Sequence, residues 1–474
     1  MTAGRGAPAV PAAPAVPATP AAHWGTFDAE RWWRAPELAT LPAVTLPGGA
    51  GAVAAMDELL AGFCAPGDLL VTRTPMADAV REGLGACGID VEPYVLRSGA
   101  AEDDRPGTSA PPTGATSTGA SFTVAPPTVD ALIAADGAAR ERITACPDVL
   151  PYAVLPDTVA LTDRLGRPGL LPPVAVVAEV NSKSWSNALV RRLGLPGAGR
   201  VVRSVDELAS AVAEFGYPVL VKDPYGVSGR DTLEIAAPGV LGAVLRTLGR
   251  QVAAGRRIEL VVQRRYARRY DFSAHLRIAR TGEATVLGVL MMTNHRFRYA
   301  GSHPADPGFL ARLDADGYFD TLAAVAEALA GAGYWGPVGV DSMAVEDGTV
   351  VPVLEINARR SLGLLSLRLD QRVRESGSGL RGHLWQVDLA VPPGRSVADL
   401  SAALHRDGAL YGGGPHPGVT LLGGSTLAAP GGRVYCALFC APDEAPVLRR
   451  RVLAAAADAG MTPRGASDGV ADAA

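Results

Sequence analysis

The stretch from Val338 to Gly363 constrains the fold of this chain more than any other segment, and it reads VGVDSMAVEDGTVVPVLEINARRSLG. Two apolar runs flank a short polar turn that contains Gly348, so the pattern predicts two adjacent strands joined by that turn. Glu355 and Asn357 are two residues apart and therefore share one face of their strand. Because unpaired carboxylates destabilise an otherwise apolar strand pair, we interpret these side chains as functional.

Asp341 lies on the first of these two strands, and the length of the turn decides which way its side chain points. A two-residue loop pairs Asp341 with Leu354, on the face opposite to Glu355. A three-residue loop, with Gly348 in the left-handed conformation, pairs Asp341 with Val353 instead. In that case Asp341 lies on the same face as Glu355.

Together, Asp341, Glu355 and Asn357 offer the oxygen ligands that Mg²⁺ prefers in proteins. The alternative is an acidic strand edge that faces solvent. The metal-site hypothesis needs all three side chains on one face, so it predicts the three-residue turn. A structure in which Asp341 points away from Glu355 would refute it.

Lysine is rare in this chain, because lysines and arginines together number 44 and only Lys183 and Lys222 are lysines. Codon bias with two accidental survivors is one interpretation. The surroundings of Lys222 favour another, because this residue ends a predicted strand and precedes a glycine-containing loop over residues 223–229. Glycines let backbone N–H groups approach phosphate oxygens closely. By itself, however, the loop could equally be a structural turn.

The remaining pattern divides the chain into four parts. Residues 68–96 predict a strand, a helix and a second strand, and a helical pattern resumes at residue 128. Residues 98–128 are rich in Ser, Thr, Gly, Ala and Pro, so we expect a flexible insertion there. The N-terminal Ala/Pro tract predicts a disordered tail, because its prolines prevent a helix. The expected parts are a tail over 1–22, a first domain over 23–180, a second over 181–395 and a small α/β domain over 396–474.

Charge and composition narrow the class of function. The net charge of −4 and the pI near 6.0 carry no signature of nucleic-acid or membrane binding. No apolar run is long enough to predict a membrane span. The five cysteines are scattered without metal-site spacing, which fits reduced thiols in the cytoplasm. We therefore expect a cytoplasmic protein that acts on small molecules.

The order of these features resembles the ATP-grasp superfamily over about residues 150–375, and EINAR (Glu355 to Arg359) is the most specific piece. The preceding βα region resembles the pre-ATP-grasp domain of that superfamily. The segment NSKSWSNALVRRLGLP and the C-terminal part are loosely similar to actinobacterial natural-product peptide ligases of the pheganomycin type. The resemblance implies an α/β chain: a Rossmann-like pre-ATP-grasp domain, an ATP-grasp fold whose two α+β subdomains clasp ATP, and a small α/β domain.

The resemblance also implies a role for each matching residue. Lys183 and Lys222 would contact the α- and β-phosphates of ATP, and Lys222 would also serve catalysis. Arg359 would be a catalytic residue that stabilises the γ-phosphate or an acyl-phosphate. Two Mg²⁺ ions, for which Mn²⁺ could substitute, would be held by Asp341, Glu355 and Asn357.

Other nucleotide contacts would come from the glycine loop and from the strand that follows it. The loop would fold over the phosphates, and the strand end after Val262 would offer backbone groups to adenine. Asp271 would lie near the ribose, although the superfamily more often has Glu there and the loop before it is one residue longer here. The residues implied are Tyr225, Gly226, Ser228, Gly229, Gln263, Arg265 and Asp271.

Substrate contacts are predicted from position alone. Residues 293–304, TNHRFRYAGSHP, lie where members of the superfamily bind the carboxylate substrate or close over it, although a plain surface loop is an equal alternative. The Arg-rich segment 256–269 could bind an acidic substrate or form a solvated face. The substrate hypothesis names Arg296, Arg298, His303, Arg360 and Ser361.

The implied activity is an ATP-dependent carboxylate–amine ligation through an acyl-phosphate, which releases ADP and phosphate. An amino acid or peptide would supply the carboxylate or the amine, in natural-product or amino-acid-derived biosynthesis. A homodimer is expected from the superfamily, with neither nucleic acid nor membrane as a partner. The alternatives are an ATP-grasp phosphotransferase and a regulatory protein that binds nucleotide without catalysis.

Overall fold

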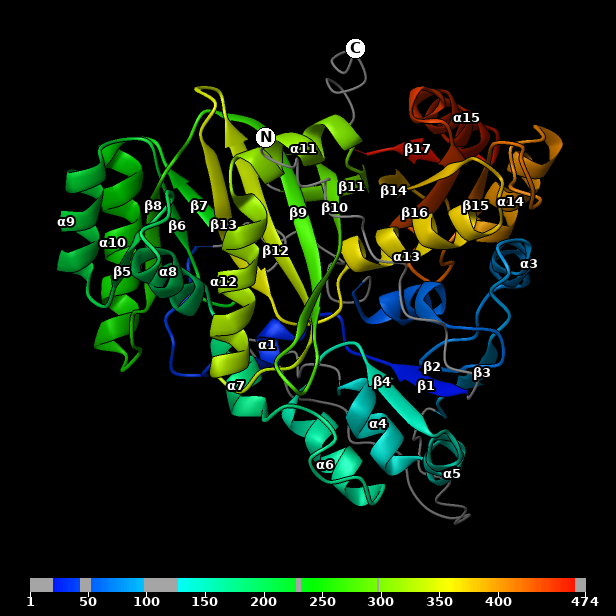
Figure 1. The fold of residues 1–474 in the computed structure, drawn as a ribbon, viewed down its shortest axis with the longest axis horizontal. Coiled ribbons are helices and arrows are strands. Elements are labelled where there is room, and N and C mark those ends of the chain that lie inside the picture. The colour runs from blue at the N-terminus through cyan, green and yellow to red at the C-terminus, as the bar shows by residue number, and fades with distance from the viewer. Residues whose placement is uncertain (1–19, 43–52, 98–126, 227–231, 296–297, 465–474) are drawn as a thin grey trace, which may run out of the picture.

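The computed structural model describes residues 20–42, 53–97, 127–226, 232–295 and 298–464. Most of the expected tail, and all but residues 127 and 128 of the expected insertion at 98–128, lie outside these ranges. Among the described residues, the strands form two four-stranded sheets and one nine-stranded sheet. In Figure 1 the small sheet of β5 to β8 lies at the left, the N-terminal sheet lies at the bottom, and the large sheet occupies the centre and upper right.

The N-terminal sheet is parallel, with strand order β3-β2-β1-β4. Parallel neighbours need crossover connections, and helices supply them here. Two strands correct the sequence-based expectations, because β1 begins inside the expected tail and β4 lies where the pattern predicts only helix. The elements are β1 (Ala21–Trp24), α1 (Glu30–Trp33), η1 (Ala55–Phe63), β2 (Leu69–Thr72), α3 (Asp78–Ala86), β3 (Glu92–Val95), α4 (Val129–Ala135), α5 (Gly137–Ala145) and β4 (Asp148–Pro151).

The small sheet has strand order β5-β8-β6-β7 with antiparallel pairing, and two helices cover it. Its core also contains Ala39 and Leu41, which follow α1 in the sequence. The N-terminal part of the chain therefore packs on this distant sheet. Helix α6 (Pro156–Arg164) packs on α4 of the N-terminal domain, and α7 (Val174–Val180) precedes α8 (Lys183–Arg192). The other elements are β5 (Arg200–Val202), α9 (Val205–Phe215), β6 (Val219–Lys222), β7 (Thr232–Ile235), α10 (Pro238–Ala253) and β8 (Leu260–Arg264).

The large sheet has strand order β13-β12-β9-β10-β11-β14-β16-β15, and β17 pairs with β14. Strand β14 pairs with β16 along its whole length, so the boundary expected at residue 395 divides a continuous sheet. The strands are β9 (Arg268–Ile278), β10 (Ala284–His295), β11 (Arg298–Pro304), β12 (Gly336–Val345), β13 (Val350–Asn357), β14 (Arg381–Ala390), β15 (Gly418–Leu421), β16 (Gly431–Cys440) and β17 (Thr462–Pro463).

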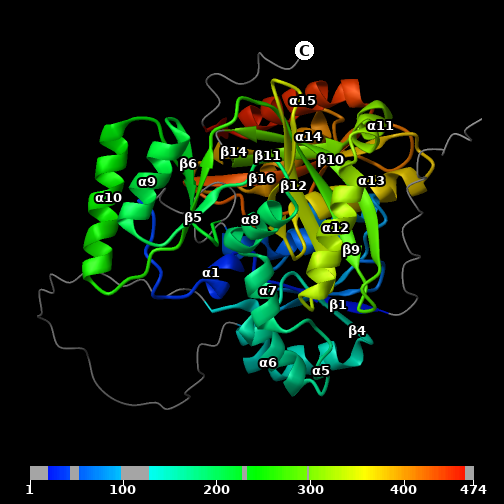
Figure 2. The ribbon, with the colours of Figure 1, turned by 60° about the vertical axis from the view of Figure 1, so that its left-hand side comes forward.

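Helices cover both faces of the large sheet (Figures 1 and 2). On one face, Tyr318 of α12 and Phe309 of α11 pack edge-to-face on Phe272. On the other face, α13 approaches so closely that a Cβ on Gly363 would lie 2.3 Å from His275. This helix also packs on η1, so it lies between the large sheet and the N-terminal domain. The helices are α11 (Pro307–Ala315), α12 (Tyr318–Gly331), α13 (Leu362–Glu375), α14 (Val397–Arg406) and α15 (Ala445–Asp458).

None of the helices in the described residues combines the length and apolar character that a membrane span requires.

Candidate active site

The turn between β12 and β13 has three residues, as the metal-site hypothesis predicts. The N–H of Val345 donates to the Thr349 carbonyl at 2.9 Å, which closes the loop around Gly348. Gly348 has φ +91°, the left-handed conformation that the three-residue turn requires. Asp341 pairs with Glu355, however, and not with Val353.

The pairing differs because the register of the hairpin shifts between Asp341 and Met343. The shift places two additional residues on β13, and an even number leaves every side chain on its original face. The predicted side was therefore correct although the predicted partner was wrong. Asn357 donates from Nδ2 to Oδ2 of Asp341 at 3.2 Å, so the two side chains meet on that face.

Asp341 lies in an environment that disfavours its charged form. Burial, and next the neighbouring Glu355 carboxylate, raise the pKa of Asp341 to about 7. Among the described residues its side-chain hydrogen bonds come from neutral groups, those of Asn357 and Ser273. Two carboxylates and an amide oxygen are ligand types that fit a divalent cation such as Mg²⁺.

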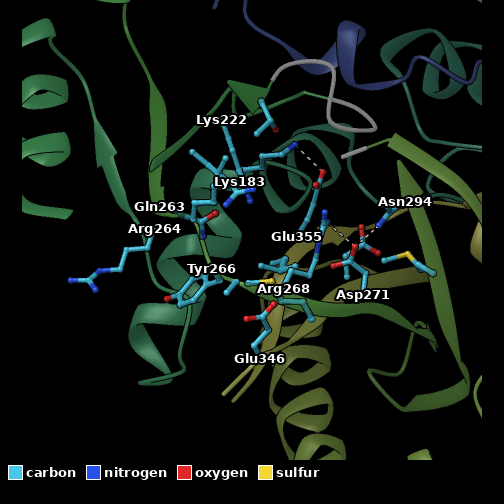
Figure 3. Close-up of a pocket in the computed structure, with 18 residues that line it drawn as sticks. Lys183, Lys222, Gln263, Arg264, Tyr266, Arg268, Asp271, Asn294, Glu346 and Glu355 are labelled. Atoms are coloured by element: carbon cyan, nitrogen blue, oxygen red, sulfur yellow. Dashed lines mark hydrogen bonds and ion pairs between the residues drawn. The ribbon is translucent and has the colours of Figure 1, made fainter. Parts of the chain in front are cut away.

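The two lysines come from different elements, and both interact with Glu355. Lys183 begins α8, and its Nζ donates to Oε1 of Glu355 at 2.8 Å and to the Gly226 carbonyl. Burial lowers the pKa of Lys222 to about 8, against the opposing effect of Glu355, while Lys183 adds to the lowering. Figure 3 shows Lys183, Lys222 and Glu355 close together at one end of the cleft.

The cleft lies between the small sheet and the large sheet, and its volume is about 430 Å³. Gln263 and Arg265 line it, but both side chains already have partners within the protein. Gln263 donates to the Gly197 carbonyl at 2.9 Å, and Arg265 forms an ion pair with Glu234 at 3.1 Å. Both residues still border the open volume of the cleft.

Asp271 lies on the opposite wall of the cleft, where two other side chains bind it (Figure 3). Asn294 donates to its Oδ2 at 2.6 Å, and Arg268 does so at 2.8 Å. Burial nevertheless raises the pKa of Asp271. Sequence reasoning missed Asn294, because only the pairing of β9 with β10 places it beside Asp271.

The loop after Lys222 is described only at its beginning. The N–H of Tyr225 donates to Oδ1 of Asp223 at 2.9 Å, and Arg34 binds the same carboxylate from the N-terminal domain. These contacts to the Asp223 carboxylate fix the backbone where the chain leaves β6. Ser228 and Gly229, which the sequence places over the phosphates, lie outside the described residues.

No protein-family profile matches the chain. A 250-residue segment is 24% identical to the butirosin acyl-carrier protein–L-glutamate ligase of Niallia circulans. The match covers 49% of this chain and 58% of that protein, so the chain spans little more than half the length of its relative.

Solved structures are similar over a larger part of the chain. The ADP complex of an N5-carboxyaminoimidazole ribonucleotide synthetase superposes with a TM-score of 0.51 at 12% identity, covering 93% of this chain and 97% of that one. The Staphylococcus aureus N5-carboxyaminoimidazole synthetase with ADP superposes with a TM-score of 0.50 at 10% identity, and the match covers 86% of this chain and 95% of that one. Rhizobium etli pyruvate carboxylase superposes with a TM-score of 0.51 at 16% identity, and the match covers 82% of this chain and 37% of that one.

The chain has the ATP-grasp fold. The expected fold class, with a Rossmann-like parallel sheet in the N-terminal part, is thereby confirmed. In ATP-grasp terms, the small sheet and the large sheet are the two subdomains, and the cleft lined by Lys183, Lys222, Asp341 and Glu355 lies between them.

Arg359, Arg360 and Ser361 follow the segment Glu355 to Ala358, and the structure separates their roles. Arg359 is buried, and its Nη2 donates to Oδ1 of Asn357 at 3.0 Å. Arg360 instead turns toward the N-terminal sheet, where its Nη1 lies 3.0 Å from Nδ1 of His23. Ser361 caps α13 by accepting the Leu364 N–H at 3.1 Å. None of these three residues lines the described cleft.

The predicted substrate segment falls mainly on β11. Met292 lines the cleft and pairs with Ser302, whereas Met291 pairs with His303. Because neighbouring residues of a strand face opposite sides, His303 lies on the face away from the cleft. Its ring packs on His383, with centroids 5.5 Å apart. Arg298 is exposed, and Arg296 lies outside the described residues.

Proposed function

We propose that this protein is an ATP-dependent carboxylate–amine ligase that releases ADP and phosphate. The observation that carries the proposal is the meeting of Lys183 and Lys222 with Asp341 and Glu355 in one cleft between two subdomains. Cations on one side and carboxylates on the other are the groups needed to bind a metal-chelated triphosphate. The ATP-grasp fold and the ligase named among the relatives support the same reading.

The metal would be held by Asp341, Glu355 and Asn357. When bound, Mg²⁺ supplies positive charge that offsets the charge of the phosphate oxygens. Lys183 and Lys222 would bind phosphate oxygens and hold the γ-phosphate in line with the substrate carboxylate.

The chemistry then needs no protein nucleophile. A substrate carboxylate oxygen attacks the γ-phosphorus of ATP, the bond to ADP breaks, and an acyl-phosphate forms. An amine next attacks the acyl carbon, which forms the amide bond and expels phosphate. Arg359, next to Asn357, would offset the charge that develops on the phosphate in both steps.

The substrates we propose are an amino acid and a small amine or peptide, in the synthesis of a natural product. The relative from Niallia circulans is named for joining L-glutamate to an acyl-carrier protein. L-Glutamate is therefore the first amino acid to test, both as the carboxylate and as the amine. A phosphotransferase and a non-catalytic nucleotide-binding protein are the alternatives.

The test is phosphate release from ATP and Mg²⁺ in the presence of single amino acids and of pairs, with mass spectrometry of the products. A ligase should release phosphate only when both a carboxylate and an amine are present, and an amide should appear. Phosphate release that never depends on an amine would contradict the ligase assignment. A phosphorylated product without an amide would favour the phosphotransferase.

Glu355→Gln tests the metal-site assignment in the same assay. Removing one carboxylate charge should lower turnover by about 10²-fold or more, because Glu355 would contact both the metal and Lys183. Glu283→Gln is the matched control, since Glu283 is an exposed residue outside the cleft. Equal activity of the two variants would argue against the proposed role.

A further inference from the structure

A chain of hydrogen bonds runs from the first helix of the N-terminal domain to the candidate metal site. Arg359 donates from Nε to Oε1 of Glu30 at 2.6 Å, and its Nη2 binds the same oxygen. That Nη2 also donates to Oδ1 of Asn357 at 3.0 Å. Asn357 in turn donates from Nδ2 to Oδ2 of Asp341 at 3.2 Å. Glu30 in α1 is therefore connected through Arg359 to two of the three candidate metal ligands. Glu30 and Arg359 lie 329 positions apart in the sequence.

The ion pair at the beginning of this chain is buried on both sides. Glu30 is 5% exposed and Arg359 is 8% exposed. A guanidinium is charged in proteins at any ordinary pH, and the Glu30 carboxylate is the ion partner of Arg359. A buried cation next to a metal site would repel the metal unless an anion offsets it, and Glu30 is the anion in contact with it.

The same contacts determine how the Asn357 amide is oriented. A guanidinium only donates hydrogen bonds, so the group that faces Arg359 must be the Asn357 oxygen and not its nitrogen. The nitrogen then faces Asp341, which accepts. The carbonyl oxygen keeps a second lone pair, which is the one available to a metal ion. Arg359 therefore fixes the direction of the ligand atom.

We propose that Glu30 is a positioning residue for metal–nucleotide binding, acting through Arg359 on the orientation of Asn357. This inference rests on the proposed function, because it assumes that Asp341, Glu355 and Asn357 receive the metal. Glu30 belongs to the N-terminal domain and does not line the cleft. The proposal therefore gives that domain an indirect role in nucleotide binding.

The expected effect has a defined sign. Glu30→Gln keeps the shape of the side chain but removes its charge, which leaves the Arg359 cation uncompensated beside the metal site. The metal-dependent gain in ADP affinity should then fall about tenfold, the size expected for losing one charged hydrogen-bonded partner. The affinity for ADP without metal should not fall, since an uncompensated cation attracts phosphate.

The experiment is calorimetric titration of ADP, once with Mg²⁺ and once with EDTA, into the wild-type protein and each variant. Glu37→Gln is the matched control, because Glu37 pairs with Arg257 at 2.9 Å in the same N-terminal segment but on the exposed surface. The control should keep the wild-type gain to within about twofold. The variants are Glu30→Gln, Arg359→Ala and the two combined.

The double variant separates positioning from a general loss of structure. If Glu30 acts through Arg359, Glu30→Gln should have no further effect on the metal-dependent gain once Arg359 is Ala. A gain in Glu30→Gln within about twofold of wild type would overturn the proposal, as would an undiminished effect of Glu30→Gln in the Arg359→Ala background. A wild-type protein that does not bind Mg²⁺–ADP would instead overturn the proposed function.

Arg359→Lys provides an independent test if Glu30→Gln does not fold. Lysine keeps the charge opposite Glu30, but it lacks the planar fork that reaches Glu30 and Asn357 together. The metal-dependent gain should therefore still fall, while the melting temperature stays close to that of wild type. An unchanged gain in Arg359→Lys would overturn the proposal.

Discussion

Replacing Asp341 with Asn should stabilise the nucleotide-free protein while it removes a candidate metal ligand. The pKa of Asp341 rises from the ordinary value of 3.8 to about 7 in the fold, because of burial and the neighbouring Glu355. The unfolded chain therefore loses its proton at lower pH than the folded chain does. Above pH 3.8 the ionisation of this side chain favours unfolding, and the full effect is reached above pH 7.

The size of the effect follows from that shift. About three pKa units correspond to about 4 kcal/mol of destabilisation at about pH 8.5, where Asp341 is ionised in both states. At about pH 5.5 the folded state keeps its proton, and the penalty is only about 2 kcal/mol. Asn resembles the protonated acid and can still accept the hydrogen bond from Asn357. The variant should therefore gain about 2 kcal/mol more over wild type at the higher pH than at the lower.

Urea denaturation of wild type and Asp341→Asn at the two pH values measures this difference. Asp90→Asn is a control, because Asp90 is an exposed residue far from the cleft lining. A second measurement, ADP titration with Mg²⁺, should show that Asp341→Asn binds the metal–nucleotide complex more weakly. The reasoning is refuted if Asp341→Asn is less stable than wild type at the higher pH, or if its advantage does not grow with pH.

Two further predictions concern cationic side chains of the cleft and its surroundings. Because burial lowers the pKa of Lys222 to about 8, the affinity for ADP should fall as the pH rises through 8. Titrations of ADP at lower and higher pH measure this fall. An ADP affinity that does not depend on pH, or an equal fall in Lys222→Met, would contradict the prediction. Arg34→Ala should lower the free energy of unfolding by about 3 kcal/mol in urea denaturation, because it leaves the buried Asp223 carboxylate without its ion partner. A decrease of less than about 1 kcal/mol would show that Asp223 finds another partner.

The parts of the site that the sequence predicts are those set by short-range geometry. Glu355 and Asn357 share a face because side chains alternate along a strand, and the left-handed Gly348 sets the length of the turn. The pairing of Asp341 with Glu355 was not predictable, because it depends on an irregularity within the hairpin. The predicted face of Asp341 was nevertheless correct, because the register shift is by an even number of residues.

The side chains that surround these ligands could not be read from the sequence. His303 was placed at the substrate because of its position in the chain, but strand pairing with Met291 turns it away from the cleft. Asn294 reaches Asp271 only because β9 folds back on β10. No periodicity along a single strand encodes such contacts, since they depend on which strands become neighbours.

By itself, the sequence determined the local chemistry: the two lysines, the acidic hairpin with its glycine turn, and the ATP-grasp resemblance that follows from their order. The tertiary structure decided which distant groups complete that chemistry. It brought Glu30 onto Arg359, Arg34 onto Asp223, and the C-terminal strands into the large sheet. The physical reason is that backbone sterics and side-chain alternation act over a few residues, whereas burial and ion pairing depend on packing between segments hundreds of residues apart.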